Sequence, residues 1–400
     1  MHRRRAAFGK ALRGTGKAVG GRLHGILIGC VHFFRRLSEF FGPMITALLD
    51  ESTRGVTLSE IIGNSSMSET ASIDQIRDLS QQLKESKAMI ARRVIGQNEV
   101  VDQTLMTVLC GGHGLLVGVP GLAKTLLVEA LGTVLGLQSN RVQFTPDLMP
   151  ADILGSEVLE TADDGSRAFR FIKGPVFCQL MMGDEINRAS PRTQSALLQA
   201  MQEHHVTVAG QRFDLPEPFH VLATQNPVEQ EGTYPLPEAQ LDRFLMQIDI
   251  DYPSYDNERA IILATTGTEQ SELEPVFNAE SLIAAQHLIR RMPVGEQVVD
   301  MILDLVRSAR PGDAGATELV NQTVIWGPGP RAAQALMLLA RARALLQGRL
   351  APSIDDVTAL ARPVLVHRMA LGFAARAEGI SLHDVITDLT ARAAKRSAAA

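Results

Sequence analysis

Two patterns of hydrophobic and polar positions divide the chain into two parts. Between residues 110 and 250, short apolar runs bounded by turn residues alternate with longer amphipathic segments. After Pro253, apolar residues recur at three- and four-residue spacing throughout. The first pattern predicts buried strands separated by helices, and the second predicts an all-helical domain. The predicted strands are Gly114–Val117, Arg141–Phe144, Val176–Gly183, His220–Thr224 and Phe244–Ile250.

Helical periodicity also precedes the first strand, from Ile73 to Arg93 and from Val100 to Leu109. Other helices are predicted inside the first part at Leu126–Leu131 and Gln194–Glu203, and the segment from Leu236 begins a short one. We therefore predict an α/β core over residues 67–252 and a helical domain over residues 253–395. The predicted helices of the second part are Glu258–Thr265, Ala279–Arg291, Gly295–Ala309, Arg331–Gln347, Ile354–Arg368 and Leu382–Ala393.

Two segments of the core read as β-hairpins rather than as strands of the main sheet. Ser156–Glu160 is the expected partner of Phe169–Pro175, joined through Asp163-Asp164-Gly165. Val206–Leu215 alternates around Gly210 and predicts a second hairpin.

Residues 1–66 differ from the rest of the chain. They carry ten Lys and Arg against four acidic residues, a net +6, so the remainder of this −5 chain carries −11. The apolar run Gly25–Phe34 is too short to span a bilayer. A signal peptide, a basic amphipathic helix on an anionic membrane and a start codon assigned too far upstream are all compatible with the segment. We favour the third interpretation, with Met67 as the natural start, and a disordered tail is compatible with it.

Composition narrows the function classes. The acidic body and the single tryptophan, Trp326, argue against general nucleic-acid binding. The cysteines at positions 30, 110 and 178 have no metal or disulfide spacing, so buried free thiols in a reducing, cytoplasmic compartment are expected. His204 and His205 are adjacent and point in different directions, so we interpret them as a helix-end feature rather than a metal site.

The stretch Gly118-Val119-Pro120-Gly121-Leu122-Ala123-Lys124-Thr125 links a predicted strand to a predicted helix. Backbone N–H groups of such a loop, together with the helix N-terminus, form an anion site. Lys124 would reach the β- and γ-phosphates of a nucleotide, and the Thr125 hydroxyl would ligate Mg²⁺. The general pattern has glycine before the lysine, where this chain has Ala123, and an ordinary strand-to-helix turn is the alternative.

Two carboxylates follow the third predicted strand. Asp184 would hold Mg²⁺ through water, and Glu185 would orient and polarise the attacking water. The alternative is that one of the two merely caps the helix that follows. Asn226 follows the fourth strand and would hydrogen-bond the γ-phosphate or the water, although Asn226-Pro227 is also a common turn. Apolar residues around Ile95 and Gly96 could flank an adenine ring, or simply pack in the core.

Three phrases resemble the MoxR family of AAA+ ATPases. They are GVPGLAKT at 118–125, DEINRASPRTQSALLQAMQE at 184–203 and ATQNPVEQEGTYPLPEAQLDRF at 223–244. With GPGPRA at 327–332, the resemblance covers residues 73–395. It implies an AAA+ P-loop NTPase core with a five-stranded parallel sheet, followed by an all-helical lid. The family accepts alanine before the loop lysine.

The resemblance also implies residue roles. Glu185 and Asn226 match the water-activating acid and the sensor asparagine. Arg243 matches the arginine finger that enters the neighbouring subunit's site, and Arg331 matches a second sensor on a lid that closes when ATP binds. Thr125 and Asp184 are the implied magnesium ligands. The implied nucleotide-binding residues are Gly118, Val119, Pro120, Gly121, Leu122, Ala123, Lys124, Thr125, Asp184, Ile95 and Gly96.

The implied function is ATP-driven, chaperone-like remodelling or maturation of a client protein complex, including metal or cofactor insertion. The resemblance implies a homo-hexamer, ATP or ADP and Mg²⁺ as ligands, and a partner with a von Willebrand A domain. The two hairpins are expected to contact the client or the partner. A DNA-directed motor is the alternative, with Lys173, Arg170 and Arg212 as candidate pore cations, and a nucleotide-binding scaffold is a third.

Overall fold

A computed structural model describes residues 73–399, except 162–166, 230 and 268–271. The prediction for residues 1–66 therefore lies outside the described residues. The described residues belong to one compact unit, Glu69–Ala400. Among them, no helix combines the length and the hydrophobicity needed to cross a bilayer.

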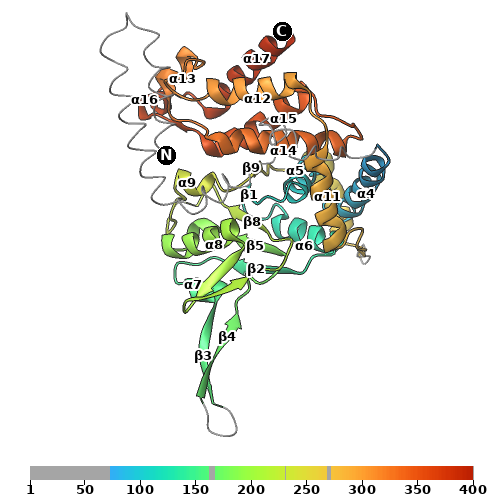
Figure 1. Cartoon of the computed structure of the whole chain (residues 1–400), viewed down its shortest axis with the longest axis vertical. Helices are drawn as coiled ribbons and strands as arrows, with labels where there is room; N and C mark the ends of the chain where they lie inside the picture. Colours follow the sequence, from blue (N-terminus) through green and yellow to red (C-terminus); the bar gives the residue numbers. More distant parts are fainter. Residues whose placement is uncertain (1–72, 162–166, 230, 268–271, 400) are drawn as a thin grey trace, which may run out of the picture. The chain divides into compact units, whose positions relative to one another are not determined.

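A five-stranded parallel sheet forms the core, in the order β2-β5-β8-β1-β9 (Figure 1). This confirms the predicted parallel sheet. Its strands are β1 (Gly114–Val117), β2 (Ser139–Gln143), β5 (Leu180–Asp184), β8 (His220–Gln225) and β9 (Met246–Asp249).

Successive residues of the central strands enter different hydrophobic clusters. Leu115 and Leu116 are both buried, yet they belong to opposite clusters, as do Val221 and Leu222. Side chains of a strand alternate between its two faces, so both faces of this sheet are covered. One cluster includes the helices α4 (Ile73–Ala91), α5 (Asn98–Leu109) and α6 (Lys124–Val134), and the other includes α7 (Pro150–Leu154) and α8 (Pro191–Glu203).

The first cluster continues into the helical part of the chain, where α14 contacts α4 and α5, and α15 contacts β9. The core and the lid therefore share one buried interior around the fifth strand. The remaining helices are α9 (Glu238–Leu241), α10 (Tyr255–Thr265), α11 (Ala279–Arg291), α12 (Glu296–Ser308), α13 (Glu318–Thr323), α14 (Pro330–Leu346), α15 (Ile354–Leu365), α16 (Phe373–Ala377) and α17 (Leu382–Ala399), with 3₁₀ turns η2 (Ile186–Arg188) and η3 (Val366–Arg368).

Both predicted hairpins are confirmed. β3 (Gly155–Thr161) pairs antiparallel with β4 (Arg167–Lys173), and β6 (His205–Val208) pairs with β7 (Gln211–Asp214). The turn predicted at Asp163-Asp164-Gly165 lies outside the described residues. The first hairpin extends away from the sheet (Figure 1), and the Phe171 and Phe213 rings stack with centroids 4.0 Å apart. This stack ties the two hairpins together at the base of the first.

Two predictions of secondary structure are wrong. The third strand begins at Leu180 rather than Val176, because residues 176–179 form a turn after Pro175. Val176 and Cys178 are nevertheless fully buried, so the apolar run reports burial and not extended backbone. The segment after Pro253 is also not wholly helical, since β10 (Val324–Trp326) pairs with β11 (Ala370–Leu371).

Two smaller predictions concern single residues. Cys110 and Cys178 are buried free thiols, as expected, and burial raises their pKa values to about 12 and about 11. Cys178 lies in the turn and not in a strand. His204 occupies the C-cap of α8 in a left-handed conformation, with φ of 55°, which confirms the helix-end interpretation.

Candidate functional site

The phosphate loop runs from the end of β1 into α6, which begins at Lys124. A Cβ at Gly118 would lie 2.7 Å from the Ile250 carbonyl oxygen, so only glycine fits against the next strand. Gly121 has φ of +85° with open space around it, so its requirement is conformational. Ala123 also has positive φ, 58°, directly before the helix. The general preference for glycine at this position therefore has a backbone cause, which the alanine accepts at some strain.

Lys124 folds back over the loop. Its Nζ donates hydrogen bonds to the carbonyl oxygens of Gly118, at 2.5 Å, and Val119, at 3.1 Å. Burial lowers the pKa of Lys124, and the nearby carboxylates of Asp184 and Glu185 oppose that shift. The lysine therefore lies within electrostatic reach of both predicted acids.

Asp184 ends β5 and is only 8% exposed. Its carboxylate accepts hydrogen bonds from the Thr224 hydroxyl and from the Arg141 guanidinium, each at 2.6 Å. The backbone N–H of Glu185 donates to the same Thr224 oxygen, at 2.8 Å. One hydroxyl on β8 therefore fixes both acids. Sequence reasoning missed this residue, whose signal was a polar side chain inside an otherwise apolar strand.

Glu185 has positive φ, 56°, and its carboxylate is held by two neighbours. Gln143 Nε2 donates to it at 2.9 Å, and Arg188 Nη1 donates at 3.0 Å. Arg188 also pairs with Glu229, at 3.1 Å, and Asn226 Nδ2 lies 3.4 Å from the same Glu229 carboxylate. These contacts join Glu185 to the loop that carries Asn226. The predicted lysine, acids and asparagine therefore gather at the carboxyl ends of β1, β5 and β8, where ligands bind in parallel sheets.

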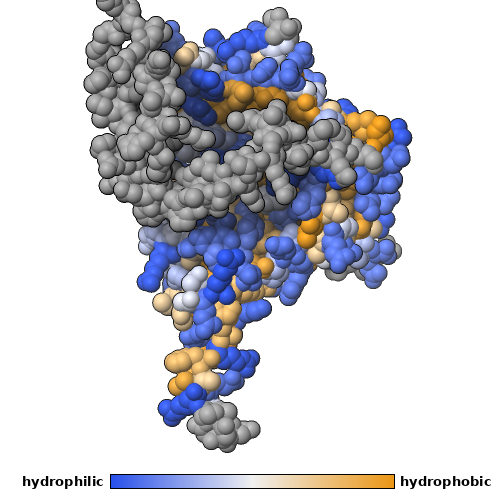
Figure 2. Space-filling view, viewed as in Figure 1, coloured by the Kyte–Doolittle hydropathy of each residue, from blue (hydrophilic) through white to orange (hydrophobic). Residues whose placement is uncertain are grey.

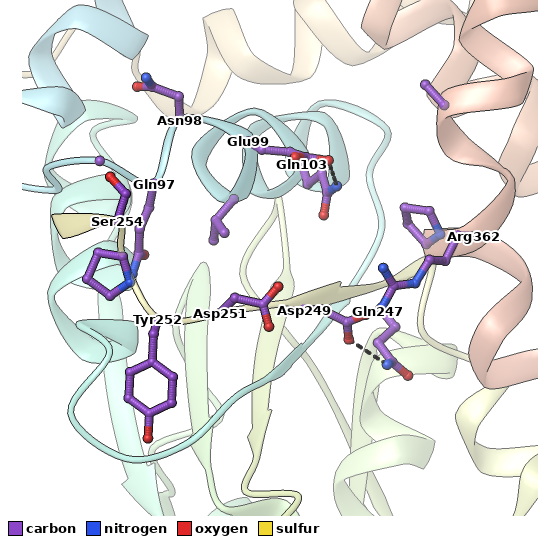
Figure 3. Close-up of a pocket in the computed structure, with 15 residues that line it drawn as sticks. Gln97, Asn98, Glu99, Gln103, Gln247, Asp249, Asp251, Tyr252, Ser254 and Arg362 are labelled. Carbon is purple, nitrogen blue, oxygen red and sulfur yellow. Dashed lines mark hydrogen bonds and ion pairs between the residues drawn. The ribbon is translucent and has the colours of Figure 1, made fainter. Parts of the chain in front are cut away.

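A cavity of about 320 Å³ lies between the start of α5, the end of β9 and the lid helix α15 (Figure 3). A smaller cavity shares Asp249, Asp251, Tyr252 and Arg362 with it and is lined in part by the phosphate-loop residues Gly118, Val119 and Leu122. Gly96 lines the larger cavity, as its predicted role requires, whereas the half-buried Ile95 is not among its lining residues.

Two polar residues of this cavity were missed by sequence reasoning. The buried Gln97 donates to the Leu122 carbonyl, at 3.2 Å, while its own amide oxygen has no hydrogen-bond partner. Arg362 reaches from α15 to pair with Asp249 at 2.8 Å, and Figure 3 shows both side chains with Gln247 on one side of the cavity. Arg362 is the lid cation nearest the phosphate loop by shared cavity walls, and nothing in its local sequence marked it.

Arg243 and Arg331 lie elsewhere. Together they line a cavity of about 250 Å³ with Gly112 and His113, which immediately precede β1, and no residue of the phosphate loop lines it. They are therefore at the amino ends of the strands, roughly 10 Å or more from the carboxyl ends, given about 3.3 Å per residue. Arg331 therefore lies away from the phosphate loop of its own subunit, and its sensor role stays a prediction.

The residues present fit MgATP. The loop offers an anion cradle with a lysine, and Thr125 on α6 and Asp184 on β5 are the oxygen-bearing residues that would hold magnesium. No group of three His, Cys, Asp or Glu side chains within the described ranges would hold a metal by itself.

Comparisons with known proteins give the family. A family model described as ATPase family associated with various cellular activities matches residues 113–246, and an AAA lid domain model matches residues 316–389. Chaperone MoxR1 of Mycobacterium tuberculosis is 40% identical over 297 residues, which cover 74% of this chain and 78% of that protein.

Two further relatives agree. The uncharacterized protein YeaC of Bacillus subtilis is 39% identical over 313 residues, covering 78% of this chain and 94% of that protein. A crystal structure of a proposed ATPase from Cytophaga hutchinsonii superposes with a TM-score of 0.73 at 36% identity, covering 79% of this chain and 95% of that one. The chain belongs to the MoxR family of AAA+ ATPases.

Proposed function

We propose that this chain is a magnesium-dependent ATPase whose sites are completed between the subunits of a cytoplasmic homo-hexameric ring. One observation carries the proposal: the acids and the lysine lie at one edge of the sheet, and Arg243 lies at the other. An arginine finger at the opposite edge cannot serve its own site, so it serves a neighbour's. A head-to-tail contact of this kind generates a ring when the rotation between subunits closes, as we propose here.

Within a site, each side chain has a distinct task. The loop N–H groups and Lys124 bind the phosphates, and Asp184 and Thr125 would hold magnesium, which neutralises charge on the β- and γ-phosphates when bound. Glu185 polarises the attacking water once its contacts to Gln143 and Arg188 are released. The neighbour's Arg243 stabilises charge that develops on the γ-phosphoryl, and the neighbour's Arg331 approaches beside it.

The output we propose is chaperone-like remodelling or maturation of a client protein, with a von Willebrand A domain partner and, in some clients, metal or cofactor insertion. Chaperone MoxR1 is named for a chaperone role. The first hairpin offers a contact surface, because Leu159 and Phe169 face each other across its strands at 52% and 70% exposure. Figure 2 shows apolar side chains gathered on this arm.

The alternative DNA-directed motor has no observation in its favour. Each of its three candidate cations already has a partner. Arg170 pairs with Glu160, Arg212 pairs with Asp214, and Lys173 lies over the Phe177 ring.

The test is the ATPase rate against protein concentration for the wild type, Glu185→Gln, Arg243→Ala and a mixture of the two variants. In a random ring, about one site in four pairs an intact Glu185 with an intact Arg243 from its neighbour. The mixture should therefore regain about a quarter of wild-type activity, although each variant alone is nearly inactive. Arg77→Ala, at a 73% exposed side chain on α4, is the matched control. Full activity of a dilute monomer, or of Arg243→Ala, would contradict shared sites.

A further inference from the structure

Arg368, at the end of η3 in the lid, is a buried cation. Its side chain is 2% exposed, and it ranks among the largest fully buried side chains in the described residues. A buried guanidinium is costly unless its donors are satisfied. Burial lowers the pKa of Arg368, and the hydrogen bond to Asp242 opposes that shift.

Most of its hydrogen bonds go to one short segment of the core. Arg368 donates to the Asp242 carboxylate at 2.8 Å and to the carbonyl oxygens of Phe244, at 2.6 Å, and Leu245, at 3.1 Å. A longer contact of 3.4 Å reaches the Asp242 carbonyl, and the remaining bond, at 2.7 Å, stays within the lid at Val364. The neighbouring His367 Nε2 also lies 3.1 Å from the Phe244 carbonyl.

This segment carries Arg243. It links α9 to β9 through turns, in which the N–H groups of residues 242–244 donate to carbonyl groups of α9 and the Leu245 N–H donates to the His113 carbonyl. Arg243 itself has no hydrogen-bond or ion-pair partner for its guanidinium within the described part of the chain. The direction of the Arg243 side chain therefore depends on a backbone whose N–H groups bond to α9 and to His113, and whose carbonyl groups at Phe244 and Leu245 are held by Arg368.

Through Asp242, Arg368 is also linked to the second predicted cation, Arg331. Asp242 accepts from Arg368 through Oδ1, while its Oδ2 lies 3.8 Å from Arg331 Nη1. Arg331 begins α14 of the lid, and Arg243 belongs to the core. One buried cation and one carboxylate therefore link the segment of the half-buried Arg243 to the exposed Arg331, and the two arginines line one cavity although they come from different parts of the chain.

We propose that Arg368 is a positioning residue that locks Arg243 and Arg331 into one unit, which acts on the nucleotide site of the adjacent subunit. The inference rests on the proposed function and deepens it. Because its side chain is only 2% exposed, we assign Arg368 a positioning role and no direct contact with nucleotide. A lysine in its place would keep the charge but would lose the planar fork that addresses several carbonyls at once. Lid movement and finger movement are then a single event.

The test is Arg368→Lys, assayed alone and in two mixtures. Alone, it should lower the ATPase rate roughly 10- to 100-fold, the usual cost of misplacing a catalytic group by about 1 Å. Its affinity for a fluorescent ATP analogue should stay within about twofold, because its own nucleotide site is intact. Mixed with Glu185→Gln, it should regain activity, since Glu185→Gln supplies an intact arginine pair. Mixed with Arg243→Ala, it should regain none.

The matched control is Arg343→Lys. Arg343 is also a largely buried lid arginine, and it pairs with the fully buried Asp356 at 2.6 Å without contacting residues 242–245. It should lower the thermal midpoint comparably but leave the ATPase rate of the folded protein near wild type. Asp242→Asn provides a second variant should Arg368→Lys fold poorly, and it should complement in the same pattern.

The outcomes separate the two proposals. If Arg243→Ala and Glu185→Gln restore each other but Arg368→Lys and Glu185→Gln do not, shared sites stand and the positioning role is wrong. Wild-type activity of both Arg368→Lys and Asp242→Asn would overturn it as well, and so would a loss of nucleotide affinity as large as the loss of rate. If Arg243→Ala and Glu185→Gln fail to restore each other, the shared-site proposal fails, and this inference fails with it.

Discussion

At the carboxyl edge of the sheet the two acids pair with arginines of the same subunit, whereas at the amino edge one arginine has no carboxylate partner in the described residues. At the carboxyl edge, Asp184 pairs with Arg141 and Glu185 pairs with Arg188. At the amino edge, Arg368 takes the nearby carboxylate of Asp242, and Arg243 has no partner in the described residues. In the proposed ring, Arg243 would meet a negatively charged group of the adjacent subunit.

The two edges also differ in how they depend on protonation. Three buried histidines lie at the amino edge: His113 before β1, His220 at the start of β8 and His367 beside the Arg243 segment. Burial lowers the pKa of His113 to about 3 and that of His220 to about 4, and it lowers that of His367 well below 6.5. The amino edge should therefore be the one that acid disrupts.

The largest expected effect is the loss of stability in acid. Because these folded-state pKa values are depressed, the unfolded chain takes up protons first as pH falls below about 6.5. The stabilisation is complete above pH 6.5 and is lost on the way down toward pH 4, on the order of 2 kcal/mol each for His113 and His220 by pH 5, with His367 acting in the same direction. Thermal midpoints from pH 7.5 to 5 measure the slope. His220→Gln should flatten it, and the exposed His287→Gln should not; equal slopes would contradict the assignment.

A smaller effect is expected at the carboxyl edge from Thr224→Val. This near-isosteric change removes the hydroxyl that holds both acids and should lower the ATPase rate by about 10²-fold. As a defect of the water-activating side, it should be rescued in mixture by Arg243→Ala and not by Glu185→Gln. Thr107→Val, at a buried threonine that bonds only its own helix, is the control. Rescue by Glu185→Gln and not by Arg243→Ala would contradict this role, because Thr224 would then act together with Arg243 and not with Glu185.

Sequence patterns predicted the carboxyl edge well because its elements are local. A strand that ends in two carboxylates, or that leads into a glycine-rich loop, can be recognised within about ten residues of sequence. Parallel strands bring such ends together at one side of the sheet. The turn at Val176–Cys178 shows the limit, since periodicity reports burial and not backbone conformation. The position of Arg331 depends on how α14 docks, through contacts with residues more than a hundred positions earlier, so no local pattern could place it.

The same limit explains the missed arginines. Arg362 and Arg368 lie near the end of one predicted helix, where a basic residue is usually a solvated side chain or a partner of the helix dipole. Only the fold turns Arg362 toward Asp249 and buries Arg368 among carbonyl groups. A long-range contact of a single side chain leaves no periodic signal.

A still smaller effect is expected from Arg362→Gln. This variant tests whether Arg362 contacts nucleotide in its own subunit, whereas Arg331 is proposed to act on the adjacent subunit. The side chain is half-exposed and lines the cavities beside the phosphate loop, so its loss should raise the Kd for ATP about tenfold, the loss of one charge-assisted contact. Isothermal titration of Glu185→Gln with and without the change measures it. Arg331→Gln is the control and should leave the Kd of an isolated subunit unchanged. A larger loss of ATP affinity for Arg331→Gln than for Arg362→Gln would show that Arg331 acts in the nucleotide site of its own subunit.

The smallest expected effect is that of Ala123→Gly at the carboxyl edge. Ala123 has φ of 58°, a region that costs a residue with a Cβ roughly 1–2 kcal/mol. Glycine removes that strain but gives the unfolded chain more freedom, so the two terms nearly cancel and the free energy of unfolding should change by less than about 1 kcal/mol. Nucleotide affinity should stay within about twofold, because the proposed phosphate contacts come from backbone N–H groups and Lys124 and not from the side chain at position 123. The control is Gly121→Ala, which introduces a Cβ where φ is +85° and should destabilise measurably. If Ala123→Gly instead weakened ATP binding tenfold, the alanine methyl would be part of the site and not a tolerated strain.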